Sequence, residues 1–138
     1  MRQQRTSIRR QTSGPGFHDL SAAVEAWLRT ISAGDGCITL FIRHTSASLT
    51  IQENADPDVL RDLAQSLEIL APEDRPYRHA TEGPDDMPAH IKTMLTSVSL
   101  SIPVAGGAMM LGTWQAVYLI EHRAHPHDRE IIAHYVGD

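Results

Sequence analysis

The sequence has 138 residues, of which 41% are hydrophobic and 21% charged, and its net charge is −5 at pH 7. It fits one globular domain, and its acidic balance argues against a nucleic-acid partner, because clustered Lys and Arg hold such partners. No run reaches the roughly 18 apolar residues of a membrane helix. The basic start lacks the apolar stretch of a secretory signal, and the single cysteine, Cys37, permits no intrachain disulfide. We therefore expect a cytoplasmic protein without a membrane partner.

The first half of the chain predicts a strand, a helix, two further extended pieces and a second helix. Residues 3–12 are expected to form a polar edge strand, and Ser21 is expected to cap the first helix. Alternating apolar residues predict strands over residues 38–42 and 49–53. The second helix should begin at Asp56-Pro57, a carboxylate cap followed by proline. Its apolar stripe comprises Leu60, Leu63, Leu67 and Leu70.

The second half predicts one more helix followed by β structure. The helix should begin at Asp85-Asp86-Met87-Pro88, which again places carboxylates and a proline at a helix start. Residues 97–102, 114–122 and 130–136 predict strands, and strands that follow one another closely favour antiparallel pairing. The sequence thus predicts one α+β domain over residues 1–138: a mainly antiparallel β-sandwich or barrel with two or three flanking helices.

Three of the predicted strands end in a titratable residue on their apolar face. His44 continues the row of Ile38, Leu40 and Ile42, Glu53 continues the row of Leu49 and Ile51, and His122 continues the row of Trp114, Tyr118 and Ile120. Burial of such groups without partners is costly. We therefore expect His44, Glu53 and His122 to meet one another, a metal or a ligand at the mouth of the core.

A metal site is one interpretation of these residues. His90 follows Asp86 by one helical turn, so it can join His44 and His122 from the third helix as a metal ligand. Glu53, Asp86 or Glu121 would then orient a ligand or move protons as the catalytic base. The alternative is that the strand-end histidines are hydrogen-bonded structural residues, and alternation alone leaves both interpretations open.

Polar segments next to these residues suggest an anion site. Thr45, Ser46 and Ser48 place three hydroxyls after His44, which suits a phosphate or carboxylate, although such a turn can also be held by its own hydroxyls. Trp114 and Gln115 follow a glycine, and they can hold a flat ring or simply enter a strand. Arg123 lies beside His122, where a guanidinium would suit a bound anion or remain a surface charge.

Four segments of the chain resemble the motifs of the YjbQ-type proteins, often called secondary thiamine-phosphate synthases. The resemblance runs from about Phe17 to the end of the chain and keeps the order and approximate spacing of the motifs. The segments are His44-Thr45-Ser46-Ala47-Ser48 with Glu53-Asn54 and Asp56-Pro57, Glu82-Gly83 with residues 85–92, Ser99–Gly107 with Gly112-Thr113-Trp114-Gln115, and Glu121-His122-Arg123.

The resemblance implies an antiparallel β-sandwich assembled as a homotrimer, with the polar motif residues, Asn54 included, in one site near a subunit interface. It implies that hydroxymethylpyrimidine diphosphate and thiazole phosphate are joined and that pyrophosphate is released. A divalent metal, zinc or magnesium, or basic groups would hold the departing pyrophosphate. The main thiamine-phosphate synthases have a (β/α)₈ barrel, a fold that needs about 250 residues. This chain is too short for it, so it would carry out that reaction on another fold.

Two other functions fit the same residues. A metal on His44, His90 and His122, with Glu53 or Asp86 as base, would also suit a hydrolase of a small phosphorylated or ester substrate. A module without catalytic activity could bind a small anion or a metal and act through contacts within the trimer. Residues alone do not distinguish these functions, since a fold and a family likeness do not fix a reaction.

Overall fold

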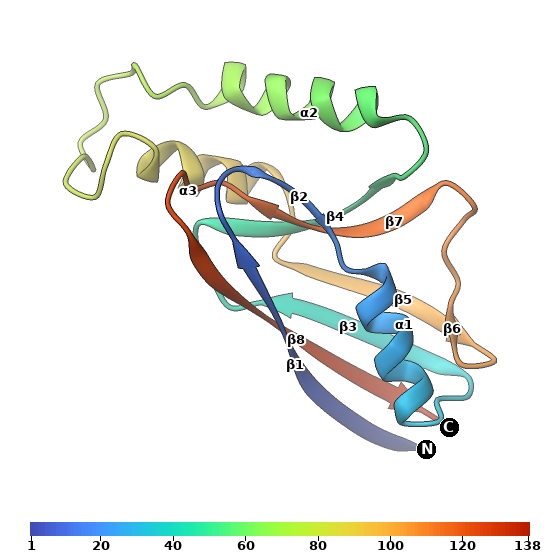
Figure 1. Cartoon of the computed structure of the whole chain (residues 1–138). Helices are drawn as coiled ribbons and strands as arrows, with labels where there is room; N and C mark the ends of the chain where they lie inside the picture. Colours follow the sequence, from blue (N-terminus) through green and yellow to red (C-terminus); the bar gives the residue numbers. More distant parts are fainter.

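The computed structural model describes all 138 residues, and it contains eight strands and three helices (Figure 1). In chain order the elements are β1 (Arg2–Thr12), β2 (Gly16–Asp19), α1 (Ser21–Thr30), β3 (Gly36–Ile42), β4 (Ala47–Glu53), α2 (Pro57–Leu70), α3 (Asp86–Leu95), β5 (Ser99–Ala105), β6 (Ala108–Met109), β7 (Gln115–Glu121) and β8 (His127–Gly137).

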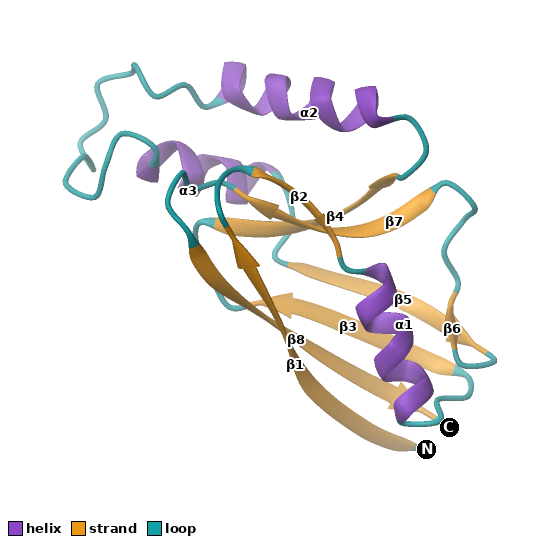
Figure 2. Cartoon of the chain, in the orientation of Figure 1, coloured by secondary structure: helices purple, strands orange, loops and turns teal.

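The strands form two antiparallel sheets, so the predicted α+β class is confirmed. The larger sheet has the order β1-β8-β3-β5-β6, and the smaller sheet has the order β2-β7-β4. Figure 2 shows α2 beyond the smaller sheet, on the side away from the larger sheet, and α3 beside one end of the strands. None of the helices is both long and apolar enough to cross a membrane.

The core lies between the sheets and beneath α1, because each strand turns alternate residues inward. Ile38, Leu40 and Ile42 of β3 are buried, as predicted, whereas Phe41 between them is 46% exposed. Val24 and Leu28 of α1 are also buried in this core. Removal of apolar surface from water, at about 25 cal/mol per Å², is the main force that holds the two sheets together.

Of the helix starts predicted for α1 and α2, one is confirmed and one is wrong. Asp56 does cap α2, since its carboxylate accepts a hydrogen bond of 2.9 Å from the Asp58 N–H. The prediction for Ser21 is wrong: Leu20 is the cap of α1, and Ser21 is the first helical residue. The Ser21 hydroxyl instead accepts a hydrogen bond from the Val117 N–H of β7, so it joins the helix to the sheet.

The two ends of the β4–β7 pair define where the polar residues lie. Ala47 pairs with Glu121 at one end, and Glu53 pairs with Gln115 at the other. We call the first the α3 end, because α3 contacts β4 there, and the second the Trp114 end. Seven paired residues at 3.3–3.4 Å per residue separate the two ends by about 20 Å.

Candidate functional site

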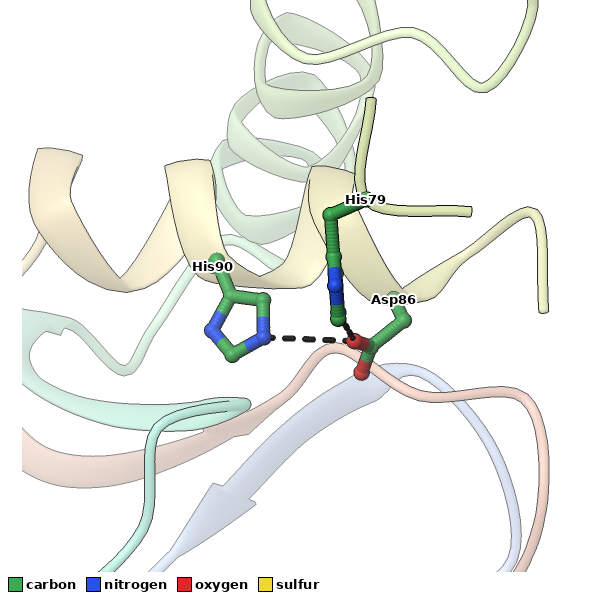
Figure 3. A group of neighbouring side chains, drawn as sticks. All are labelled: His79, Asp86 and His90. Atoms are coloured by element: carbon green, nitrogen blue, oxygen red, sulfur yellow. Dashed lines mark hydrogen bonds and ion pairs between the residues drawn. The ribbon is translucent and has the colours of Figure 1, made fainter. Parts of the chain in front are cut away.

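Two histidines and one carboxylate converge at the α3 end. Asp86 is the first residue of α3, His90 lies one turn later, and His79 comes from the loop between α2 and α3. The Asp86 Oδ2 atom is 2.5 Å from Nε2 of His79 and 3.2 Å from Nε2 of His90. Figure 3 shows both imidazole rings turned toward this carboxylate, and the ring centroids are 5.5 Å apart. We call these three residues the His79 cluster.

The His79 cluster has the chemistry of a divalent-metal site. One ligand atom from each residue lies within 4.8 Å of the others. Imidazole nitrogens and a carboxylate oxygen suit zinc and other transition metals, and ligands about 2.0–2.2 Å from an ion lie roughly 3 Å from each other. Two histidines and one carboxylate would also leave coordination positions open for water or substrate. The three residues therefore fit a metal with small movements of their side chains.

Asp86 is held ionised in spite of its burial. Burial alone would raise its pKa, but the hydrogen bond from His79 and the charges of Arg123 and His90 outweigh burial, so the pKa lies below its usual value. The second oxygen of Asp86, Oδ1, accepts a hydrogen bond of 2.5 Å from Nη1 of Arg123. The carboxylate thus presents Oδ2 to the histidines and Oδ1 to a guanidinium, which fixes its orientation.

Arg123 is a brace for the start of α3 and is not free for a ligand. Its Nε donates to Asp85 Oδ2 at 3.0 Å and its Nη2 donates to the Glu82 carbonyl at 2.8 Å, in addition to the bond with Asp86. The Asp85 carboxylate does not cap its own helix, since it accepts from Arg123 and from the Ala124 N–H instead. The sequence suggested that Arg123 could bind an anion. In the structure its side-chain donors instead bond to Asp85, Asp86 and the Glu82 carbonyl.

The three histidines predicted as one set of metal ligands do not lie together. Only His90 belongs to the His79 cluster. His44 extends β3 of the larger sheet, whereas His122 extends β7 of the smaller sheet, so each contacts a different layer of the protein. His79 was not predicted because it lies in an irregular loop with no periodic pattern. Its one signal was its place in a polar run shortly before Glu82 and Asp86.

His122 is buried and neutral. Its Nε2 lies 2.9 Å from the Ser48 hydroxyl, and the side chain is among the buried polar groups of the protein. Burial, and secondarily the charge of Lys92, lowers the pKa of His122 from 6.5 to about 4. The structure therefore favours the alternative that this histidine is a hydrogen-bonded residue of the interior, and Ser48 is its partner.

Glu121 forms a buried ion pair with Arg129, a residue that the sequence did not single out. Glu121 accepts hydrogen bonds from Thr12, from Arg129 Nε at 2.7 Å and Nη2 at 2.5 Å, and from the N–H groups of His122 and Arg123. Burial would raise its pKa, but these bonds hold the pKa below its usual value. A carboxylate with so many donors has no capacity left to act as a general base, so its predicted catalytic role is replaced by a structural one.

The β3–β4 turn and Arg129 border an open depression of about 500 Å³. Arg129 Nη2 donates to the hydroxyl and the carbonyl of Ser46, at 3.0 and 3.2 Å. His44 Nε2 accepts from the Glu130 N–H at 2.8 Å, so the ring hydrogen is on Nδ1. The 3.4 Å contact of Nδ1 with Arg129 Nη1 then joins two donors and is not a hydrogen bond. Burial and Arg129 lower the pKa of His44, in keeping with a neutral ring.

One hydroxyl links the depression to the helix that carries His90. The hydroxyl of Thr93 on α3 is 2.8 Å from the His90 carbonyl and 3.3 Å from the Thr45 carbonyl. It therefore joins the helix that carries His90 to the turn that carries the predicted hydroxyl residues.

The remaining predicted site residues lie at the Trp114 end. The prediction that Glu53 shares a mouth with His44 and His122 is wrong, because the antiparallel register places Glu53 opposite Gln115. Asn54 donates its N–H to the Trp114 carbonyl at 3.0 Å, and Gln115 Oε1 accepts from the Gly112 N–H at 2.7 Å. The Trp114 side chain is 63% exposed. Within one chain, the predicted residues thus form two groups about 20 Å apart.

The fold and the match of the whole sequence place this chain in a known family. The family model described as UPF0047 protein YjbQ-like matches residues 5–138, and the chain belongs to this family. A UPF0047 protein of Synechocystis is 53% identical over 128 residues, which are 92% of this chain and 87% of that protein. The UPF0047 protein YjbQ of Salmonella typhimurium is 42% identical over 89% of this chain and 90% of its own length.

A solved structure has the same architecture. The crystal structure of a YjbQ/UPF0047 family protein of Clostridium acetobutylicum has a TM-score of 0.88 and 35% identity, and it covers 95% of this chain and 99% of its own.

Proposed function

We propose that this protein is an enzyme that acts on a small phosphorylated molecule with a divalent metal ion on His79, Asp86 and His90. The observation that carries the proposal is the convergence of three ligand atoms on one point, with an ionised Asp86 held by Arg123. A metal bound there would act as a Lewis acid on a phosphate oxygen. The residues of the chain would orient it, since Arg123 fixes Asp86 and the turn of α3 fixes His90.

The adjoining depression supports a phosphate-containing substrate. Arg43 and Arg129 border the depression, each already paired with a carboxylate, Glu130 and Glu121 respectively. The donors that remain there for an anion are Nη1 of Arg129 and the Nδ1–H of His44, which lie 3.4 Å apart. Two donors side by side without a shared acceptor attract an oxygen of an anion. Because Thr93 joins this depression to the helix of His90, one diphosphate-sized molecule would contact both places. The hydroxyls of Thr45 and Ser46 would complete the binding surface.

The reaction that we favour is the transferase reaction that the family resemblance implies. The bond between the pyrimidine methylene carbon and the diphosphate oxygen breaks, the thiazole nitrogen forms a bond with that carbon, and pyrophosphate leaves. The depression and the His79 cluster would hold the leaving group. Trp114 of the same chain cannot hold the pyrimidine there, because it lies at the opposite end of the β4–β7 pair.

A metal-dependent hydrolase is the second candidate. The observation in its favour is that the cluster offers only three protein ligands. Catalytic zinc sites commonly have three protein ligands and a water that the metal makes nucleophilic. Such an enzyme would need one phosphorylated or ester substrate and water, whereas the transferase would need two organic substrates.

Metal content and product release test the proposal together. Wild-type protein should contain near-stoichiometric metal by inductively coupled plasma mass spectrometry, and His79→Ala should lose it. His125→Ala is the matched control, because the side chain of His125 is exposed and belongs to no cluster. Pyrophosphate release that requires both thiamine precursors would support the transferase, and release of phosphate from single esters would support the hydrolase. Metal-free wild type with full activity would contradict the proposal.

The resemblance also leads us to propose a homotrimer in the cytoplasm. Large apolar side chains are exposed at the ends of α2 and α3, where Ile69 is 72% and Met94 is 88% exposed. Exposed apolar groups of this kind are typical of surfaces that a second copy covers. Light scattering coupled to size-exclusion chromatography should give three times the mass of the 15.3 kDa chain.

A further inference from the structure

A second small pocket lies under α2, apart from the His79 cluster. Its volume is about 90 Å³. Its apolar wall includes Phe17, Leu67 and Ile120, and its polar wall includes Glu68, Lys92 and His122. The volume of about three water molecules is enough for one phosphate group.

Lys92 is the only cation in this pocket, and its only ion-pair partner, Glu68, can be displaced. The Lys92 side chain is 7% exposed, whereas that of Glu68, with which it forms an ion pair, is 57% exposed. Glu121 also borders the pocket, but its charge is already balanced by Arg129. A buried ammonium needs a counter-ion, because an unpaired charge in the interior costs several kcal/mol or more. Lys92 is therefore more stable with an anionic oxygen beside it than without one.

Within its own chain, the helix that supplies Glu68 is weakly held. Although α2 is amphipathic, none of its residues is buried, and the ion pair of Glu68 with Lys92 is its only side-chain bond to a distant part of the chain. By contrast, α3 buries Asp86, Pro88, Ala89 and Lys92. Segments with few buried contacts open at low free-energy cost. Glu68 can therefore leave Lys92 when α2 moves.

His122 adds a polar group to the pocket without adding charge. Its Nε2 is taken by Ser48, and its Nδ1 has no hydrogen-bond partner within the chain. Since the protein has no buried side-chain nitrogen or oxygen without a partner, Nδ1 must be reachable from outside. With the Ser48 hydroxyl as donor to Nε2, the ring hydrogen is on Nδ1, which can donate it to an oxygen of a ligand beside Lys92.

We propose that Lys92 and His122 form a phosphate-binding site under α2, and that Glu68 occupies the place of the phosphate until a ligand displaces it. In this arrangement α2 is a lid, and the ion pair that closes it places the Glu68 carboxylate where the phosphate would bind. The ligand is a small molecule with a phosphate group and an apolar part that lies against Phe17 and Ile120. The site does not depend on the His79 cluster, because Lys92 and His90 lie on different faces of α3.

The decisive test is the affinity of metal-free protein for inorganic phosphate, measured by isothermal titration calorimetry with chelator present. Glu68→Gln removes the internal competitor and should bind phosphate about fivefold more tightly than wild type, the worth of a partly exposed ion pair. Lys92→Met should bind at least tenfold more weakly. Asp62→Asn is the matched control, since it removes a carboxylate from the exposed face of the same helix and should leave affinity unchanged.

Hydrogen exchange separates displacement of the lid from adventitious binding. Phosphate should speed the exchange of the α2 backbone amides in wild type, because the ligand takes the place of Glu68 and frees the helix. Unchanged or weaker phosphate binding by Glu68→Gln overturns the proposal, even if Lys92→Met fails to fold. No measurable phosphate binding by either protein, or slower exchange of α2 with phosphate, overturns it as well. Chelator in every sample removes any contribution of a metal at the His79 cluster. Phosphate bound in the depression beside Arg129 would persist in Lys92→Met and would not speed the exchange of α2, so the two proposals remain distinguishable.

Discussion

Two groups of charged residues at the α3 end use the same kinds of side chain for different purposes. Glu121 and Arg129 are almost fully buried, and Glu121 has donors on both oxygens. The His79 cluster contains one buried carboxylate, but its histidine side chains are 41% and 34% exposed. A buried charge with all its hydrogen bonds made within the protein serves stability. Convergent ligand atoms that remain open to solvent are what the proposed metal site requires.

The largest effect should come from breaking the buried pair. Arg129→Met leaves the Glu121 carboxylate buried without its counter-ion, and loss of one partner of such a pair costs about 3–5 kcal/mol. Chemical denaturation should show that loss in the free energy of unfolding. The double variant Glu121→Gln with Arg129→Met should recover part of it, because no buried charge then remains unpaired. A single variant with wild-type stability would show that solvent reaches Glu121.

The next effect is a pH dependence that originates at His122. Its pKa is about 4 in the folded protein and 6.5 in the unfolded chain, so below pH 6.5 the unfolded state binds a proton that the folded state does not. Stability should therefore fall as the pH drops from 6.5 to 4, by about 3 kcal/mol at 1.36 kcal/mol per pKa unit. His122→Gln should remove this part of the slope, whereas His125→Gln should retain it.

The smallest effect should come from the open cluster. In metal-free protein, His79→Ala removes one hydrogen bond to the Asp86 carboxylate, which keeps its bond from Arg123, and a single hydrogen bond contributes about 0.5–1.5 kcal/mol. The free energy of unfolding should therefore change little, while metal stabilises wild type and not the variant. A loss as large as that of Arg129→Met would show that the His79 cluster is a structural brace and would remove the contrast between the two groups.

The sequence predicted most strands well, because their residues alternate and burial follows alternation. The exception is β7, which is buried on both faces: Val117 and Leu119 belong to the core, whereas the predicted inward row of Tyr118, Ile120 and His122 lies on the opposite face. Ile38, Leu40 and Ile42 face the core as expected. It placed Asp86 and His90 together correctly, since the helical turn fixes residues four apart. It failed where chain direction matters: alternation shows which face Glu53 occupies, but only the antiparallel register shows at which end of the sheet it lies.

The residues missed by sequence reasoning lie where local pattern carries no information. His79 reaches the site from an irregular loop. Arg129 lies on the inner face of β8, at a position where the pattern leads one to expect an apolar residue. Arg129 could be found in principle, because an arginine in phase with Ile131, Ala133 and Tyr135 requires a buried acidic partner. The choice of Glu121 as that partner depends on how the two sheets face each other, which no spacing in the sequence encodes.

The hydroxyl of Thr93 has one hydrogen and lies within bonding distance of two carbonyls, those of His90 and Thr45. It donates fully to one of them or partially to both, so the helix and the turn compete for a single donor. If the proposed metal and anion both bind, a molecule in the depression that changes this competition would also change the metal affinity of His90. By thermodynamic reciprocity, a metal at the cluster then alters the affinity of the depression by the same factor.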